Sequence, residues 1–176
     1  MDNFAEQLVK RENLPSDNSR KTVMLIGEVL LVLVLGAIFV LTLGTFIAIL
    51  ALLLLIASVF GAKKLLEGFS VEYEYTLTNG ELDIDKIIAQ KKRKTLITID
   101  VKKISKIAVF DENVPDNASL TIVLASDNID SHEYYADFTH DDFGDVRLIF
   151  SPNEKILEAI KIYLPLRVRT ELEKEN

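Results

Sequence analysis

The feature that constrains this chain most is a long apolar stretch near its N-terminal end. Residues 29–62 contain no charged side chain, and Glu28 is the single charge between Thr22 and Ala62. The hydrocarbon core of a bilayer is about 30 Å thick, and roughly 20 apolar residues span it as a helix. A soluble domain of this size would leave such a surface in water. We therefore expect the stretch to lie in a membrane.

The length of the stretch predicts two crossings. A straight helix over residues 22–62 would be on the order of 60 Å long at 1.5 Å per residue, and a tilt of about 40° does not absorb that excess. Helices over about 22–41 and 45–64 fit if the chain reverses near 42–45, Thr-Leu-Gly-Thr. Glycine accepts the positive φ of a tight turn, and threonine hydroxyls bond loose backbone groups. A single kinked span or a re-entrant segment is the alternative.

The charges that flank the two predicted spans set their orientation. Arg20 and Lys21 precede the first span, Lys63 and Lys64 follow the second, and the turn carries neither Lys nor Arg. Positively charged flanks stay in the cytoplasm. We expect a multi-pass protein of the inner cell membrane with both termini cytoplasmic.

Two polar side chains fall inside the predicted spans. In a hairpin centred near Leu43, Glu28 lies across from Ser58. Intramembrane carboxylates are costly and often functional, but Glu28 is only about 8 Å from Val23 along the helix axis. We interpret it as an interfacial charge that reaches a local partner such as Lys21. A proton or ion path is the alternative.

Residues 1–21 are expected to form a short amphipathic helix and a linker. Asn3 and Glu6 have the spacing of a capping box. Apolar residues follow at helical spacing, and the polar run that starts at Pro15 interrupts the pattern. The helix would lie on the membrane surface or dock on the following domain, and a frayed terminus is the alternative.

The stretch 70–88 has the alternation of a β-hairpin. Asn79-Gly80 is a strong signal for a two-residue type I′ turn. The turn and the alternation predict the same register, with Leu77 opposite Leu82, Tyr75 opposite Ile84 and Val71 opposite Ile88. Glu74 then faces Asp85 on the outer side, a like-charged pair that costs a little unless solvent or a cation screens it.

Five more strands and one helix are expected after the hairpin. The strand candidates are Thr95–Asp100, Ile104–Phe110, Ser119–Ala125, His132–Phe138 and Val146–Phe150. Ser151 is the expected N-cap of a helix that ends near Pro165. The fold class is α+β: a transmembrane helical hairpin over 22–64, then a seven-stranded sandwich or open barrel over 65–176 capped by a C-terminal helix.

This arrangement resembles bacterial membrane proteins that carry a pleckstrin-homology-like domain. The stretch VEYEYTLTNGELDIDKIIAQKKRK and the N-terminal FAEQLVKR are similar to a family of small two-span proteins from Gram-positive bacteria. The resemblance covers most of the chain and implies the architecture. It implies no activity, because that family offers no catalytic residues to carry over.

The basic run Lys91, Lys92, Arg93, Lys94 is the candidate lipid contact. Lipid-binding pleckstrin-homology domains place basic residues around the first hairpin, and the turn at 78–81 has none, which disfavours phosphoinositide recognition. The run is expected in the next turn, where each cation near an anionic surface contributes roughly 1 kcal/mol. A solvated hairpin tip is the alternative.

The rest of the soluble part is acidic. Residues 65–176 carry 14 Lys and Arg against 22 Asp and Glu, a net charge of −8, and seven acids lie between Asp127 and Asp145. Such a surface repels nucleic acid and an anionic bilayer, so it is expected to face away from the membrane or to meet a basic protein. His132, His140 and Asp137 match no known ligand spacing, and the acids do not follow the EF-hand pattern. We expect solvated acidic loops with no metal and no cofactor.

These observations predict a binding module without catalysis. The chain has no Cys, no Gly-x-Ser-x-Gly motif and no phosphate-binding glycine loop. We expect a scaffold that is integral to the lipid bilayer and engages a protein partner through a sheet edge, the acidic surface or the C-terminal segment 166–176. The alternative is anionic-lipid sensing through 91–94.

Overall fold

The structure is a computed structural model that describes residues 3–111, 114, 120–127 and 133–175. The chain divides into two compact units. One is helical and spans Asn13–Ser70. The other combines Met1–Glu12 with Val71–Asn176 and contains all the described strands. The predicted α+β class is confirmed.

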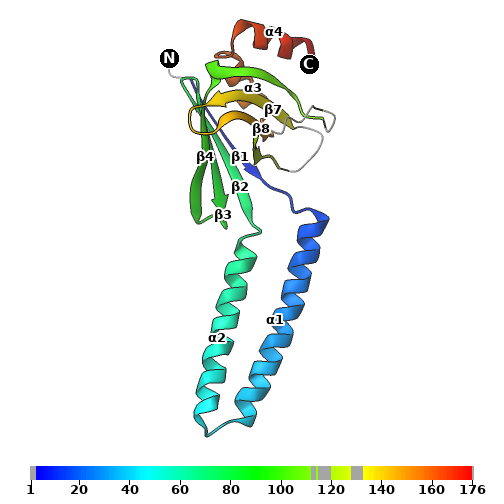
Figure 1. Cartoon of the computed structure of the whole chain (residues 1–176), viewed down its shortest axis with the longest axis vertical. Helices are drawn as coiled ribbons and strands as arrows, with labels where there is room; N and C mark the ends of the chain where they lie inside the picture. Colours follow the sequence, from blue (N-terminus) through cyan, green and yellow to red (C-terminus); the bar gives the residue numbers. More distant parts are fainter. Residues whose placement is uncertain (1–2, 112–113, 115–119, 128–132, 176) are drawn as a thin grey trace. The chain divides into compact units, whose positions relative to one another are not determined.

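The helical unit is a hairpin of two antiparallel helices, α1 (Pro15–Leu41) and α2 (Phe46–Glu67), as Figure 1 shows. The chain reverses where the sequence predicted. Gly44 has a φ of 88°, the Thr42 hydroxyl donates to the Ile38 carbonyl at 2.7 Å, and the Thr45 hydroxyl donates to the Thr42 carbonyl at 2.8 Å. Both helices are long and apolar enough to cross a membrane.

The predicted linker before the first span is wrong in part. α1 begins at Pro15, where we expected the polar run to interrupt helical structure. Proline suits the first helical position because its missing N–H has no intrahelical acceptor there. The Ser19 hydroxyl donates to the Pro15 carbonyl at 3.0 Å, and that of Thr22 donates to the Asn18 carbonyl at 2.9 Å. Polar side chains thus continue the helix.

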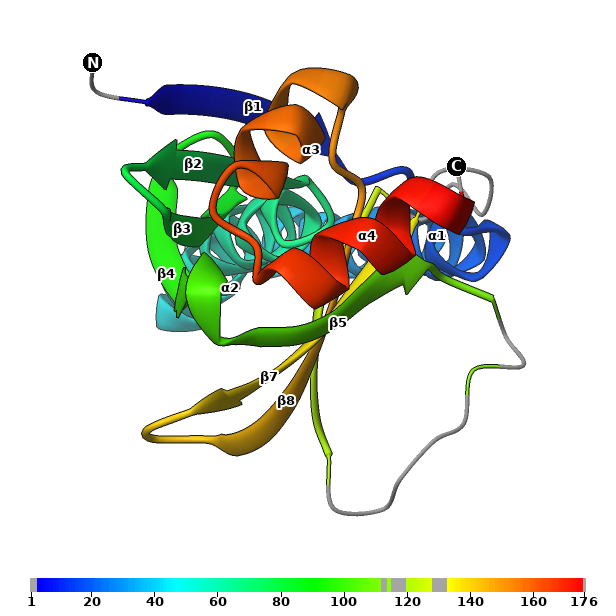
Figure 2. The same ribbon diagram turned by 90° about the horizontal axis from the view of Figure 1, so that it is seen from above.

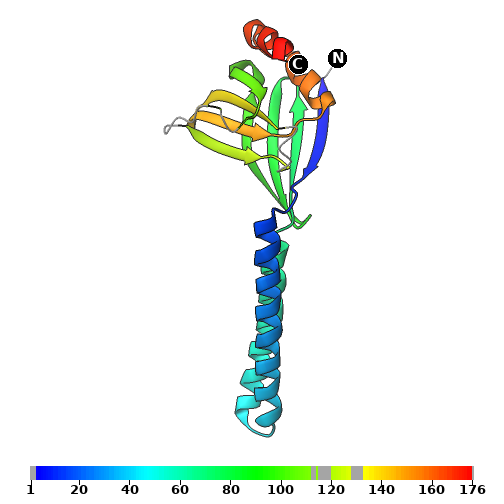
Figure 3. The same cartoon turned by 90° about the vertical axis from the view of Figure 1, so that its right-hand side faces the viewer.

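The predicted N-terminal helix is also wrong, because residues Phe4–Lys10 form strand β1. This strand pairs antiparallel with β2 (Val71–Thr78) over seven residues, and Figure 3 shows it in blue beside β2. Ala5 and Val9 are buried and lie four residues apart, a spacing that fits a helix and a strand equally. The unpaired edge of β2 decides between them, since it offers seven residues of backbone pairing.

The first sheet contains β1, β2, β3 (Glu81–Ile88) and β4 (Lys92–Asp100) in that order. The register predicted for the β2–β3 hairpin is confirmed at every predicted pair, including Glu74 opposite Asp85. Asn79 and Gly80 have φ values of 52° and 93°, as a type I′ turn requires. A Cβ on Gly80 would lie 2.7 Å from the Tyr163 ring, so glycine is also needed for packing.

The second sheet has the order β5–β7–β8–β6, with β6 parallel to β8. Its strands are β5 (Ile104–Val109), β6 (Thr121–Ala125), β7 (Tyr134–His140) and β8 (Gly144–Phe150). They coincide with four predicted strands. The expected first residues of two of these, Ser119 and His132, lie outside the described residues. With β1, the described unit has eight strands instead of the predicted seven.

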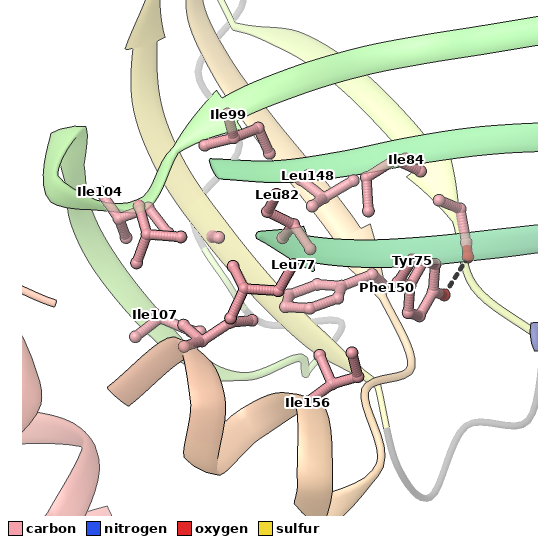
Figure 4. Packing of buried hydrophobic residues seen from close by; sticks show 14 of the residues in the cluster. Tyr75, Leu77, Leu82, Ile84, Ile99, Ile104, Ile107, Leu148, Phe150 and Ile156 are labelled. Atoms are coloured by element: carbon pink, nitrogen blue, oxygen red, sulfur yellow. Dashed lines mark hydrogen bonds between the residues drawn. The ribbon is translucent and has the colours of Figure 1, made fainter. Parts of the chain in front are cut away.

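A single large core lies between the two sheets (Figure 4). Tyr75 and Phe150 meet edge to face, with ring centroids 5.9 Å apart. The buried Tyr75 hydroxyl donates to the Ala125 carbonyl and accepts from the Ser151 N–H at 3.2 Å. This hydroxyl joins β2 of one sheet to β6 and the end of β8 in the other.

Two helices complete this unit, α3 (Glu154–Lys161) and α4 (Leu166–Glu175). The N-cap of α3 is Asn153, whose side chain accepts from the Ile156 N–H at 2.9 Å, and not Ser151 as predicted. The C-terminal segment is a helix along β5 (Figure 2), with Val168 and Leu172 buried. It is therefore part of the fold and not a free tail.

Candidate functional site

The basic run 91–94 does not form one loop. The turn between β3 and β4 covers Ala89–Lys91, so Lys91 lies in the turn and the next three cations lie in β4. Successive side chains of a strand point to opposite faces. Arg93 therefore lies on the face opposite that of Lys92 and Lys94, and the prediction of a single basic loop is corrected.

A β-bulge decides which face each cation occupies. Ile84 pairs with Ile97, but the next residue, Asp85, pairs with Thr95, so Leu96 is an extra residue in β4. A shift of one residue exchanges the two faces of a strand. Lys94 consequently pairs with Lys86, and Arg93 falls on the outer side.

The outer face carries the predicted like-charged pair and its cation. The Arg93 guanidinium forms an ion pair with Glu74 and lies 3.7 Å from an oxygen of Asp85. Burial raises the pKa of the Glu74 carboxyl, Arg93 lowers it, and a hydrogen bond with Glu6 raises it further. Arg93 is therefore committed to screening carboxylates of its own sheet.

The inner face carries three lysines, Lys86, Lys92 and Lys94, which we call the lysine face. Tyr73 is opposite Lys86, which is opposite Lys94, and Ile88 is opposite Lys92. Directly opposed residues share a face, and Tyr73 belongs to the core. None of the three lysines forms an ion pair with a described residue.

The lysine face lies at the end of the sheet from which the chain runs to the helical unit. β1 ends at Lys10 and α1 begins at Pro15, a link of at most about 18 Å at 3.6 Å per residue. α2 ends at Glu67 and β2 begins at Val71, which limits that link to about 14 Å. The flanking charges belong to the helices: Arg20 and Lys21 to α1, Lys63 and Lys64 to α2.

Glu28 and Ser58 face one cavity of about 290 Å³ between α1 and α2. One Glu28 carboxylate oxygen is enclosed and has no hydrogen-bond partner among the described residues. The Ser58 hydroxyl donates to the Leu55 carbonyl at 2.9 Å. Lys21, the partner expected for Glu28, lies over the Phe69 ring at 5.3 Å. Lys63 shares a second cavity of about 580 Å³ with Glu28.

The described residues of the acidic region are largely paired within the fold. Asp137 accepts two hydrogen bonds from Arg147 at 2.7 and 2.8 Å, and Asp141 forms an ion pair with Lys103 at 3.2 Å. His140 accepts from the Asp142 N–H at 3.1 Å. His132 and Asp130 lie outside the described residues. In the part of the chain that the structure describes, no three His, Asp or Glu side chains are placed to hold a metal ion.

Strand β6 is an edge of the second sheet. Among the described strands, it pairs with β8 alone. Ile122 and Leu124 on this strand are 47% and 60% exposed. Neither showed a functional signal in the sequence, because a short continuous apolar run such as 122–125 usually indicates a buried strand.

The comparisons with known proteins identify one family. The family model described as Bacterial PH-like domain (DUF6106) matches residues 1–170. That range includes β1, the helical hairpin, both sheets and α3. The predicted resemblance to bacterial proteins with a pleckstrin-homology-like domain is confirmed. No curated protein and no solved structure matches the chain.

Proposed function

Since the chain belongs to the bacterial PH-like domain family (DUF6106), we propose that it is a membrane-anchored binding module without catalytic activity. The helical hairpin is its anchor in the inner cell membrane, and the PH-like unit is its cytoplasmic binding part. Its partner is a protein.

The topology of the first sheet supports this anchoring. The hairpin is inserted between β1 and β2, which pair over seven residues. Two strands of one sheet must lie on the same side of a membrane, so the hairpin crosses an even number of times. The cations at both helix ends favour the cytoplasm for that side.

The edge strand β6 is the observation that favours a protein partner. An edge strand presents unpaired backbone N–H and C=O groups, and an extended segment of another protein can add to it as a further strand. Ile122 and Leu124 would give such a segment apolar contacts at alternate positions. A second predicted route, the C-terminal segment, is engaged within the fold through Val168 and Leu172.

Site-specific photocrosslinking tests this proposal. A photoreactive residue replaces Leu124 in the full chain, expressed in its native membranes, and the matched control replaces Leu166, an exposed leucine on α4. We expect a discrete protein adduct at position 124 that is absent at 166. Equal adducts at both positions, or none at 124, would count against a partner at β6.

A second candidate, contact with anionic lipid, is favoured by a separate observation. The cations expected to act together in 91–94 are divided by the sheet, but Lys92 and Lys94 share a face with Lys86. These three lysines together form the candidate surface for contact with anionic lipid.

A further inference from the structure

We infer that the lysine face is a binding site for the phosphate-bearing headgroups of anionic lipids. The inference rests on the proposed function in one respect: the helical hairpin must lie in a bilayer. It replaces the linear run 91–94 with a set of residues that are dispersed in the sequence, on β3 and β4.

The first argument is electrostatic. Lys86 and Lys94 are directly opposed across the two strands, and like charges in that position destabilise a sheet. The nearest carboxylates in the register, Glu74 and Asp85, lie on the other face and pair with Arg93. A compensating anion for the lysine face therefore comes most readily from outside the described fold.

The second argument is the sorting of charge by the bulge. If β4 paired regularly beyond Ile97, with Leu96 opposite Asp85, Arg93 would share the inner face with Ile97, and Lys92 and Lys94 would lie among the outer carboxylates. The irregular register instead collects three cations on one side. β-bulges often re-aim side chains beside functional sites.

The third argument is chain length. The lysine face is at the sheet end that two short links connect to the helices, and the shorter link, 68–70, allows at most about 14 Å between Glu67 and Val71. Val71, Ile88 and Lys92 occupy one row of paired residues at this end. The tether thus keeps the site near the bilayer surface, where anionic headgroups are concentrated.

The three lysines distinguish this site from the two other anion-binding candidates in the chain. The β2–β3 turn at Asn79-Gly80 contains no basic residue. Lys103, beside that turn, forms an ion pair with Asp141 and is already compensated.

Energy transfer from the full chain to labelled lipids tests the site. The chain contains no cysteine, so Thr95→Cys gives a unique position for a donor fluorophore on β4. The protein is reconstituted into nanodiscs of phosphatidylcholine, with or without phosphatidylglycerol, that contain an acceptor headgroup. We expect greater transfer with phosphatidylglycerol and a decrease at high salt, because salt screens the attraction.

Three triple variants make the test specific. Replacing Lys86, Lys92 and Lys94 by Gln should lower the ratio of docked to undocked protein by roughly fivefold per lysine. Replacing all three by Arg should preserve docking. The matched control Lys102→Gln, Lys155→Gln, Lys174→Gln makes the same change in net charge on exposed lysines elsewhere and should leave docking unchanged.

The outcomes separate the possible failures. Transfer that is independent of phosphatidylglycerol, or a control triple that is as damaging as the lysine-face triple, would overturn the site while the chain remains in the disc. Competition by millimolar glycerol phosphate would assign the site to a soluble phosphate and overturn the lipid assignment. A chain that leaves the bilayer in alkaline carbonate would overturn the anchored module and the lipid site together.

Discussion

At the residue scale, the hydroxyl of Tyr75 is a buried polar group that makes two hydrogen bonds within the core. It donates to the Ala125 carbonyl and accepts from the Ser151 N–H. Burial raises the pKa of this phenol, so it stays protonated and able to donate. One atom thus links the two sheets.

The Tyr75→Phe variant should lower the free energy of unfolding by about 1–3 kcal/mol, because it leaves a buried N–H and a buried carbonyl without their partner. Denaturant unfolding of the full chain in detergent measures the effect. Tyr163→Phe is the control, since Tyr163 is partly exposed and its hydroxyl makes no comparable link among the described residues. Equal losses in the two variants would contradict the role given to Tyr75.

Glu74 predicts a pH dependence of stability. Its pKa is raised above the ordinary 4.5, mainly by burial. The folded chain therefore binds this proton more tightly than the unfolded chain. The stability that protonated Glu74 contributes is full below the ordinary pKa and is lost as pH rises through the raised one.

In the Glu74→Gln variant this loss should disappear. The stability of the wild type relative to the variant should therefore fall as pH increases from about 4 towards neutrality. Unfolding curves collected across this range measure the difference, with exposed Glu81→Gln as the control. Parallel pH profiles for the wild type and Glu74→Gln would contradict the account.

The sequence predicted the residue pairs of the β2–β3 hairpin, because turn chemistry and alternation specify the same register. It also indicated that Glu74 and Asp85 are a like-charged pair that solvent or a cation must screen. It did not indicate that Arg93 is that cation. Thr95 and Leu96 carry no signal for a bulge, and the bulge sets the face of every residue before it in β4.

At the scale of elements, β1 is an integral strand of the PH-like unit. It buries Ala5 and Val9, and the Gln7 side chain accepts from the Asn153 N–H at 2.7 Å and donates to the Ser151 carbonyl at 2.9 Å. Hence the unit is discontinuous in sequence, and residues 65–176 are not a complete domain.

A fragment of residues 71–176 should be at least about 3 kcal/mol less stable than one in which a flexible linker joins residues 3–12 to 71–176. The difference reflects lost apolar burial and unpaired backbone on β2. Urea unfolding of the two soluble fragments measures it. Equal stability would show that β1 contributes nothing to the fold.

Deletion of Leu96 should remove the bulge and leave the faces of 92–95 unchanged, because Thr95 then adjoins Ile97 and keeps its pairing with Asp85. A double-mutant cycle between Glu74 and Arg93 should give a coupling of a few tenths to about 1 kcal/mol in the wild type, since Arg93 is 58% exposed. The coupling should persist in the deletion variant. Loss of the coupling on deletion would mean that Leu96 is not the extra residue that sets the position of Arg93.

The sequence predicted most elements and failed at β1 for a physical reason. Helix or strand cannot be decided within FAEQLVK, because its buried residues are four apart. The decision depends on β2, more than 60 residues later in the chain. The remaining strands alternate clearly, and the two helices of the hairpin are defined by length and hydropathy alone.

At the scale of the whole molecule, the hairpin interrupts a sheet between its first two strands. This insertion makes the anchor and the binding unit interdependent, because β1 reaches β2 only if the chain returns to the side from which it entered the membrane. The apolar length of the stretch, the turn at 42–45 and the β1–β2 pairing all require the same reversal.

Thiol accessibility in intact cells tests this reversal most directly. Single cysteines replace Asn13 before the hairpin, Leu43 in its turn and Glu158 on α3, in a chain that has no other cysteine. The account predicts that an impermeant reagent labels position 43 in intact cells and labels 13 and 158 only after permeabilisation. Labelling of 13 and 158 from opposite sides of the membrane would contradict it.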